Sequence, residues 1–146
     1  MGSWGSEAGL RRVARLADGW LASGYNTTPE LFAKAWRQLQ EFLVAASKDA
    51  SSFPNAIATM WMYITDNERD ADRILNEVLA PVLNRPVPEL RERLPIGSAL
   101  NCAEKLAAYQ NVGAQRVYLW PLADELEQIK IFMEQVAPLI DRKINT

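Results

Sequence analysis

The sequence has 146 residues, of which 49% are hydrophobic and 23% charged, with a formal net charge of −2; this length allows one domain with its own core. The small net charge does not indicate binding to nucleic acid or to an anionic membrane. No apolar run approaches the roughly 18 residues of a membrane-spanning helix. Without histidine and with one cysteine, zinc sites, Ser-His-Asp triads, Cys-His dyads and internal disulfides are excluded, and we expect no bound metal.

Two helices and a short strand are expected in the first third of the chain. Apolar side chains at helical spacing predict a helix over 6–18, which Gly19 ends. The apolar run 20–22 is expected to form a short strand. Thr28 followed by Pro29 is typical of a helix start, because Thr caps free backbone N–H groups and Pro suits the first turn.

The central segment predicts a buried strand followed by a helix. Residues 57–64 are aromatic and β-branched, which favours a strand covered on both faces. Thr65 and Glu68 have the spacing of a capping box, in which the two side chains satisfy each other's free backbone donors. We expect the helix that follows to bury an apolar stripe that includes Val78 and Val82.

The next segment is expected to contain a loop, a helix and a strand. Residues 84–95 are rich in proline and charge, which predicts a loop with one helical turn at Glu89 to Arg93. Ser98 is the predicted cap of a helix that Gly113 ends, and on it Cys102 is expected to be a buried structural thiol and not a nucleophile. Residues 116–120 then form a predicted strand.

A final helix is expected from about Asp124. Its predicted buried positions are apolar and recur at helical spacing: Leu126, Ile129, Met133, Val136 and Ile140. Strands separated by helices predict right-handed parallel crossovers, and hence the α/β class. The N-terminus lacks the basic and apolar regions of a signal peptide, so we expect a cytoplasmic protein.

Three segments carry a resemblance to a known family. The first is 2–21, which opens Gly-Ser-Trp-Gly-Ser-Glu; the second is Thr-Pro-Glu-Leu-Phe at 28–32; the third comprises 95–98, 103–109 and 117–121. In this order they resemble luciferase-like monooxygenases, the family of bacterial luciferase and its deazaflavin-dependent relatives. The first looks like the end of that family's fifth barrel strand, the helix after it and the start of the sixth strand. The third looks like its last helix–strand unit.

The resemblance implies a (β/α)8 TIM barrel with its cofactor at the C-terminal ends of the strands. It implies that residues 1–146 form one partial barrel domain, the C-terminal half, from about the end of strand five through strand eight and the final helix. Strands one to four would precede residue 1. The implied activity is that of a flavin- or deazaflavin-dependent oxidoreductase or monooxygenase, with FMN or a deazaflavin coenzyme and an unidentified small-molecule substrate as ligands.

The candidate cofactor-binding residues are Gly2, Ser3, Gly5 and Ser6. Small residues let backbone N–H groups approach an anion, and the N-terminus of the following helix adds partial positive charge. In the resembled family this turn contacts the phosphate of the flavin or deazaflavin. The other interpretation is an ordinary Gly-Ser turn in which Ser6 caps the helix. No carboxylate pair is arranged as an acid/base couple, so no catalytic residue is predicted.

Several functional interpretations remain open. The chain could act in an oxidoreductase as a homodimer or with a complementary half-barrel, because an open half-barrel leaves sheet edges and an apolar inner face exposed. Alternatively, it is a non-catalytic half-barrel remnant or binding module that self-associates. A third interpretation is a small doubly wound α/β domain, which would need a fourth strand that the sequence does not reveal.

Overall fold

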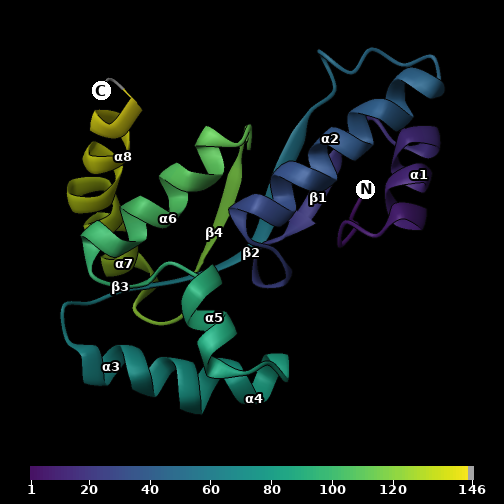
Figure 1. Ribbon diagram of the computed structural model, residues 1–146. Helices are drawn as coiled ribbons and strands as arrows, with labels where there is room; N and C mark the ends of the chain where they lie inside the picture. Colours follow the sequence, from purple (N-terminus) through teal and green to yellow (C-terminus); the bar gives the residue numbers. More distant parts are fainter. Residues whose placement is uncertain (145–146) are drawn as a thin grey trace. The chain divides into compact units, whose positions relative to one another are not determined.

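Parallel strands alternate with helices along the chain, so the expected α/β class is confirmed (Figure 1). The computed structural model describes residues 1–144. These divide into two compact units: unit 1 contains residues 1–59 and 109–118, and unit 2 contains the remainder. No helix in the described part of the chain is both long and apolar enough to cross a membrane.

Unit 1 begins with two helices that pack against each other. Ser6 accepts a hydrogen bond from the Gly9 amide at 3.3 Å and Thr28 accepts one from the Leu31 amide at 3.3 Å, so both expected N-caps form. The elements of unit 1 are α1 (Glu7–Leu16), β1 (Trp20–Ser23), the 3-10 helix η1 (Gly24–Asn26), α2 (Pro29–Ala45) and the first half of β2 (Asn55–Ile64). Its fully buried side chains include Leu10, Val13, Phe32, Leu39, Leu43 and Ile57.

Strand β1 has a parallel neighbour on each side. On one side it pairs with β2, in the register Trp20 to Asn55. On the other side Gly2 forms a parallel bridge with Leu21, and the Ser3 amide donates to the Leu21 carbonyl at 3.1 Å. The N-terminal residues therefore extend the sheet on this side of β1.

Strand β2 changes its buried face at Thr59. Before this residue Ile57 is buried, and after it Met60 and Met62 are buried, so the alternation shifts by one position. Thr59 has a φ of 55°, in the left-handed region that β-branched residues rarely adopt. One extra residue in a strand reverses which face each later side chain takes, as in a β-bulge.

Unit 2 contains the end of β2, which pairs in parallel with β3 through Tyr63 and Ile96. Strand β4 also pairs with β2, and in unit 2 the Leu122 amide donates to the Met62 carbonyl at 3.1 Å. The remaining elements in chain order are α3 (Glu68–Arg73), the π-helix η2 (Ile74–Leu79), α4 (Ala80–Leu83), α5 (Val87–Arg93), β3 (Ile96–Gly97), α6 (Ala99–Asn111), β4 (Val117–Pro121), α7 (Glu125–Ile131), the π-helix η3 (Phe132–Val136) and α8 (Ala137–Ile144).

The expected capping box after β2 is wrong. Asn67 caps α3 by accepting from the Arg69 amide at 3.1 Å, whereas the Thr65 hydroxyl accepts from the Asn67 amide. An Asx cap two residues later replaces the Thr cap, because either short polar side chain can satisfy the first free amides.

The buried stripe of the following helix also differs from the expectation. Val78 is half-buried and Val82 is 75% exposed, while Leu79 is buried. A π-helical stretch covers this region, and its wider turn moves the buried position one residue later than α-helical spacing predicts.

The segment 84–95 is more regular than expected. Residues Val87–Arg93 form α5, and Ile96–Gly97 form a fourth strand that the sequence did not reveal. Pro86 and Pro88 do not break α5, because they lie before it and in its first turn, where an amide hydrogen has no helical acceptor.

The expected burial of the last helix is mostly wrong. Leu126 is 87%, Ile129 50% and Met133 61% exposed; Ile140 is half-buried, and of the five positions only Val136 is buried. Gln128 is buried in their place. Its side chain accepts from the Ile64 amide at 2.6 Å and donates to the Ile64 carbonyl at 3.0 Å, so this face of α7 is held by hydrogen bonds to β2.

Candidate functional site

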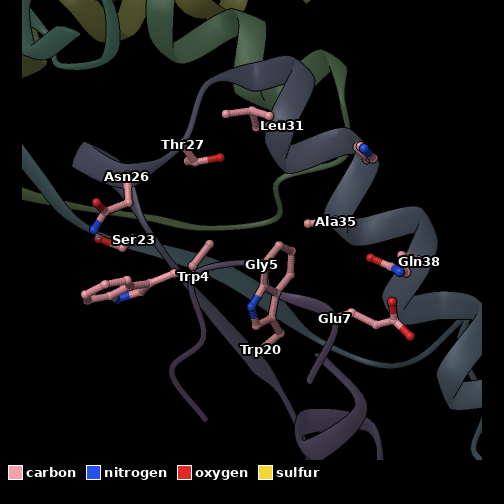
Figure 2. A pocket seen from close by; sticks show the side chains of 12 residues that line it. Trp4, Gly5, Glu7, Trp20, Ser23, Asn26, Thr27, Leu31, Ala35 and Gln38 are labelled. Carbon is pink, nitrogen blue, oxygen red and sulfur yellow. Dashed lines mark hydrogen bonds between the residues drawn. The ribbon is translucent and has the colours of Figure 1, made fainter. Parts of the chain in front are cut away.

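A cavity of about 340 Å³ in unit 1 lies between the N-terminal segment, the carboxyl end of β1 and one face of α2 (Figure 2). Helix α2 contributes side chains three and four positions apart, which lie on one helical face: Leu31, Lys34, Ala35 and Gln38. Carboxyl ends of parallel strands are the usual ligand-binding edge of α/β proteins. This cavity is therefore the candidate site.

The predicted phosphate-binding residues fall into two groups in the structure. Gly5 lines the cavity and has a φ of 82°, and a Cβ there would lie 3.3 Å from the Ala35 Cβ. Gly2, Ser3 and Ser6 are not among the lining residues: Gly2 bridges to β1 and Ser3 is buried. Of the four predicted residues, the turn thus brings only Gly5 to the wall of the cavity.

The first turn of α1 has hydrogen-bond donors that its N-cap does not satisfy. Ser6 caps the Gly9 amide, but the amides of Glu7 and Ala8 have no acceptor within residues 1–144. The Ser6 hydroxyl hydrogen also has no acceptor there. A helix begins with free N–H groups that favour an anion. Ser6 therefore serves as a cap, as one interpretation predicted, without consuming every donor of the turn.

The charges at the cavity are of both signs. Lys34 contributes a cation and Glu7 a carboxylate. The Glu7 carboxylate accepts from Arg11 at 2.8 Å, and the Arg11 guanidinium lies 4.2 Å from the centre of the Phe42 ring. Arg11 is not among the lining residues, but its pairing offsets the negative charge that Glu7 would present to an anion.

Aromatic side chains form the floor and the edge of the cavity. Trp20 is buried, stacks on Phe32 with ring centroids 5.0 Å apart, and donates its indole N–H to the Ser3 carbonyl at 3.3 Å. Trp4 is 73% exposed and lies beside Ser23 at the edge (Figure 2). The fixed Trp20 shapes the cavity, and the free face of the Trp4 indole offers a stacking surface to a planar ring.

Hydroxyl and amide groups line the end of β1. Asn26 Nδ2 donates to Ser23 Oγ at 3.1 Å, and Ser23 Oγ lies 3.0 Å from Thr59 Oγ1. Thr27 Oγ1 donates to the Thr28 carbonyl at 3.2 Å. The hydroxyl groups of Ser23 and Thr27 are therefore held in fixed orientations at the cavity wall.

A larger cavity of about 740 Å³ lies in unit 2, at the ends of β2 and β3. Its cations are already engaged: Arg91 pairs with Asp72, and Lys105 Nζ donates to the carbonyls of Arg91 and Leu94. Burial lowers the pKa of Lys105. With its cations engaged in this way, it is a weaker candidate for an anionic cofactor.

Cys102 behaves as the sequence predicted. It is fully buried on α6, and burial raises the pKa of its thiol to about 11, against a smaller opposite effect of Lys105. A thiol with this pKa is almost entirely protonated at neutral pH and so is not a nucleophile.

Sequence reasoning missed most of the α2 side of the cavity. The pattern was visible, since residues 31, 34, 35 and 38 repeat at helical spacing. However, a mixed apolar and polar face at that spacing is equally typical of an ordinary half-buried surface helix. The position of Gly5 against Ala35 is what identifies this face of α2 as part of the cavity.

No family model matches the sequence, and none of the curated proteins matches it. Solved structures share its fold. An F420-dependent secondary alcohol dehydrogenase in complex with an F420–acetone adduct superposes with a TM-score of 0.75 at 15% identity, covering 92% of this chain and 46% of its own. A coenzyme F420-dependent tetrahydromethanopterin reductase from Methanopyrus kandleri gives 0.66 at 14%, with 94% and 49% covered.

An EDTA monooxygenase from Chelativorans sp. BNC1 gives a TM-score of 0.67 at 14% identity, covering 97% of this chain and 45% of its own. This chain thus spans about half the length of the structures it matches. Their fold is the luciferase-like TIM barrel. At this low identity the likeness establishes the fold alone: this chain has the α/β architecture of part of a TIM barrel.

Proposed function

We propose that this chain is the C-terminal half of a luciferase-like barrel, and that its unit 1 cavity holds part of the flavin or deazaflavin cofactor of a cytoplasmic oxidoreductase or monooxygenase. The observation that carries the proposal is the position of the cavity, at the carboxyl end of β1 and beside the Gly5 turn and the free amides of α1. Barrel enzymes bind their ligands at this end of the strands.

The strand order supports the assignment to the C-terminal half. The end of a strand at residues 1–3 lies beside β1, β1 lies beside β2, and β2 pairs with β4. Four successive neighbours in chain order are what strands five to eight of a barrel would give. β3, which pairs with the end of β2, is an addition to that order.

The names of the similar structures support the cofactor class. Two are named for F420, and further matches are a riboflavin lyase with modified FMN and a 3,6-diketocamphane monooxygenase in complex with FMN. F420 is a deazaflavin. The proposal extends this class of cofactor to the present chain.

The residues of the cavity fit the phosphate end of such a cofactor. Lys34 and Gly5 line the cavity and supply a cation and an open backbone, and the adjoining first turn of α1 supplies the free amides of Glu7 and Ala8. A volume of about 340 Å³ is at the lower end of small-molecule sites, so the cavity takes only part of the molecule. The rest of the pocket would come from strands one to four.

The role of this chain is to bind and orient. When bound, the cofactor supplies hydride transfer or the activation of oxygen. Lys34 and the α1 amides would hold its phosphate, Trp4 would stack on a planar ring, and Trp20 would exclude water from the floor. The small-molecule substrate would lie on the side that the other half completes.

A fluorescence titration tests the proposal. FMN and a deazaflavin coenzyme are added to the wild type and to two variants, Gly5→Val and Gly113→Val. Both glycines have a left-handed φ, 82° and 93°, so the backbone strain is matched, but only Gly5 lines the cavity. We expect saturable binding to the wild type and to Gly113→Val, and loss of binding in Gly5→Val with its circular dichroism unchanged.

The alternative is a non-catalytic half-barrel remnant or binding module that self-associates. It is favoured by the exposed apolar stripe on α7 and η3, formed by Leu126, Ile129 and Met133. Absence of binding of both cofactors to the wild type would contradict the first proposal and favour this one. A second copy or a complementary half-barrel is the partner we propose for the stripe in either case.

A further inference from the structure

The carboxyl end of β1 and the turn after it place two hydroxyl groups in one wall of the unit 1 cavity, those of Ser23 and Thr27 (Figure 2). We call these two residues the acceptor wall. A hydroxyl has one hydrogen to donate and two lone pairs to accept with. Where each hydrogen goes therefore decides what the wall can offer to a ligand.

The hydrogen of Ser23 is committed inside the protein. Thr59 Oγ1 donates its own hydrogen to the Ala58 carbonyl at 2.6 Å. In the 3.0 Å contact between Ser23 Oγ and Thr59 Oγ1, Ser23 must then be the donor. Asn26 Nδ2 donates to Ser23 Oγ at 3.1 Å and occupies one of its lone pairs. One lone pair of Ser23 is left for the cavity.

The hydroxyl hydrogen of Thr27 is also used in a hydrogen bond within the protein. Its hydroxyl donates to the Thr28 carbonyl at 3.2 Å, so only lone pairs of its oxygen remain. Both hydroxyl groups can therefore accept a hydrogen bond from a ligand, and neither can donate one without breaking an internal bond. Two acceptors on one wall repel an anion and favour a ligand that carries O–H or N–H donors.

We propose that the acceptor wall binds a hydroxyl-donating chain of the ligand, such as the polyol side chain that flavins and deazaflavins share. The assignment rests on the proposed cofactor site and deepens it. It divides the cavity in two: the polyol lies along Ser23 and Thr27, and the phosphate lies toward Lys34 and the first turn of α1.

Thr59 acts as a positioning residue in this arrangement. Its φ of 55° is unusual for a β-branched residue, and it brings Thr59 Oγ1 within reach of both the Ala58 carbonyl and Ser23. By accepting the Ser23 hydrogen, Thr59 fixes the rotation of the Ser23 hydroxyl and so the direction of its remaining lone pair. It does not itself line the cavity.

The test compares riboflavin with lumiflavin. The two share a ring system, but only riboflavin carries the polyol chain, so the ratio of their dissociation constants isolates the contribution of that chain. From the usual strength of a hydrogen bond we expect the wild type to bind riboflavin about fivefold more tightly. Ser23→Ala should lower this ratio, because only the Thr27 acceptor of the wall then remains.

Two variants of Thr59 separate positioning from folding. Thr59→Val keeps the β-branched shape and the same backbone strain but removes the group that fixes the rotation of the Ser23 hydroxyl, so the ratio should also fall. Thr59→Ser keeps the hydroxyl and should restore the wild-type ratio. Circular dichroism and the urea midpoint of each variant confirm that the compared chains are folded.

The possible outcomes distinguish a failure of the acceptor wall from a failure of the proposed cofactor site. Equal affinities of both flavins for the wild type, unchanged in Ser23→Ala, overturn the acceptor wall and leave the cofactor site standing. If neither flavin binds, the proposed function fails. In that case a titration with ribitol, which is the polyol chain without the ring, tests the acceptor wall by itself. Amide shifts confined to Ser23, Asn26 and Thr27 when ribitol is added support the acceptor wall; no shifts overturn it.

Discussion

Gly9 lies in the first turn of α1 directly over the Gly-Ser turn. A Cβ at this position would collide with Ser3 Oγ and lie 2.9 Å from Ser6 Oγ, and both oxygens accept hydrogen bonds from backbone amides. In Gly9→Ala the gain in helix propensity, about 1 kcal/mol, is outweighed by an overpacking cost of about 1–3 kcal/mol. We expect a net loss in the free energy of unfolding, measured by urea denaturation.

Gly2→Ala is the matched control for Gly9→Ala. A Cβ on Gly2 meets no atom within 4 Å, so the free energy of unfolding should stay that of the wild type. A Gly9→Ala chain as stable as the wild type would show that the Ser3 and Ser6 hydroxyl groups turn away without cost, and that the tight turn described here is not maintained.

Single residues were predictable where their interactions are local. The caps Ser6 and Thr28 bond to amides three residues away, so a short window of sequence contains both partners. Ser23 and Thr59 are 36 positions apart and meet only because β1 pairs with β2. No local pattern contains such a contact, and the acceptor wall could not be predicted from the sequence.

Helix α7 is attached to β2 through Gln128. Its amide group bonds both the N–H and the C=O of Ile64, and all of these groups are buried. Gln128→Leu is similar in size but leaves both backbone groups without a partner. We expect it to lower the free energy of unfolding by about 2–4 kcal/mol, from the cost of two unsatisfied buried groups.

Gln135→Leu provides the control, because Gln135 is exposed on the same helical segment. Its effect should stay within about 0.5 kcal/mol, as for surface substitutions in general. Equal losses for the two variants in urea denaturation would mean that Gln128 does not hold α7 to the strand end.

The errors in element prediction have one physical origin. Sequence patterns locate helices well but assume α-helical spacing and an apolar buried face. The π-helix η2 moves the buried position to Leu79, and the face of α7 that carries Gln128 is buried through polar bonds. Tertiary contacts decide both features, so periodicity alone misplaced Val82 and Leu126.

At the scale of the whole molecule, the exposed stripe of Leu126, Ile129 and Met133 should be covered by a second copy of the chain. We expect the wild type to sediment as a dimer at micromolar concentration and Ile129→Lys to sediment as a monomer. Val82→Lys changes an exposed apolar residue outside the stripe and should leave the dimer intact. A monomeric wild type would contradict the self-association.

The architecture as a whole was the most predictable feature, because alternating strands and helices with parallel crossovers restrict the topology strongly. The site was predictable only in part. Of the four predicted cofactor-binding residues Gly5 lines the cavity, whereas the contribution of α2 depends on how Ala35 packs against Gly5.

The central claim is that the unit 1 cavity binds a flavin-type cofactor. Its most direct test is an amide ¹H–¹⁵N spectrum of the chain titrated with FMN. We predict saturable shifts at Gly5, Ser23 and Lys34 and at the Trp4 indole, all of which belong to the cavity. Shifts confined to the unit 2 cavity around Gly97 and Ser98, or no shifts at saturating FMN, would contradict it.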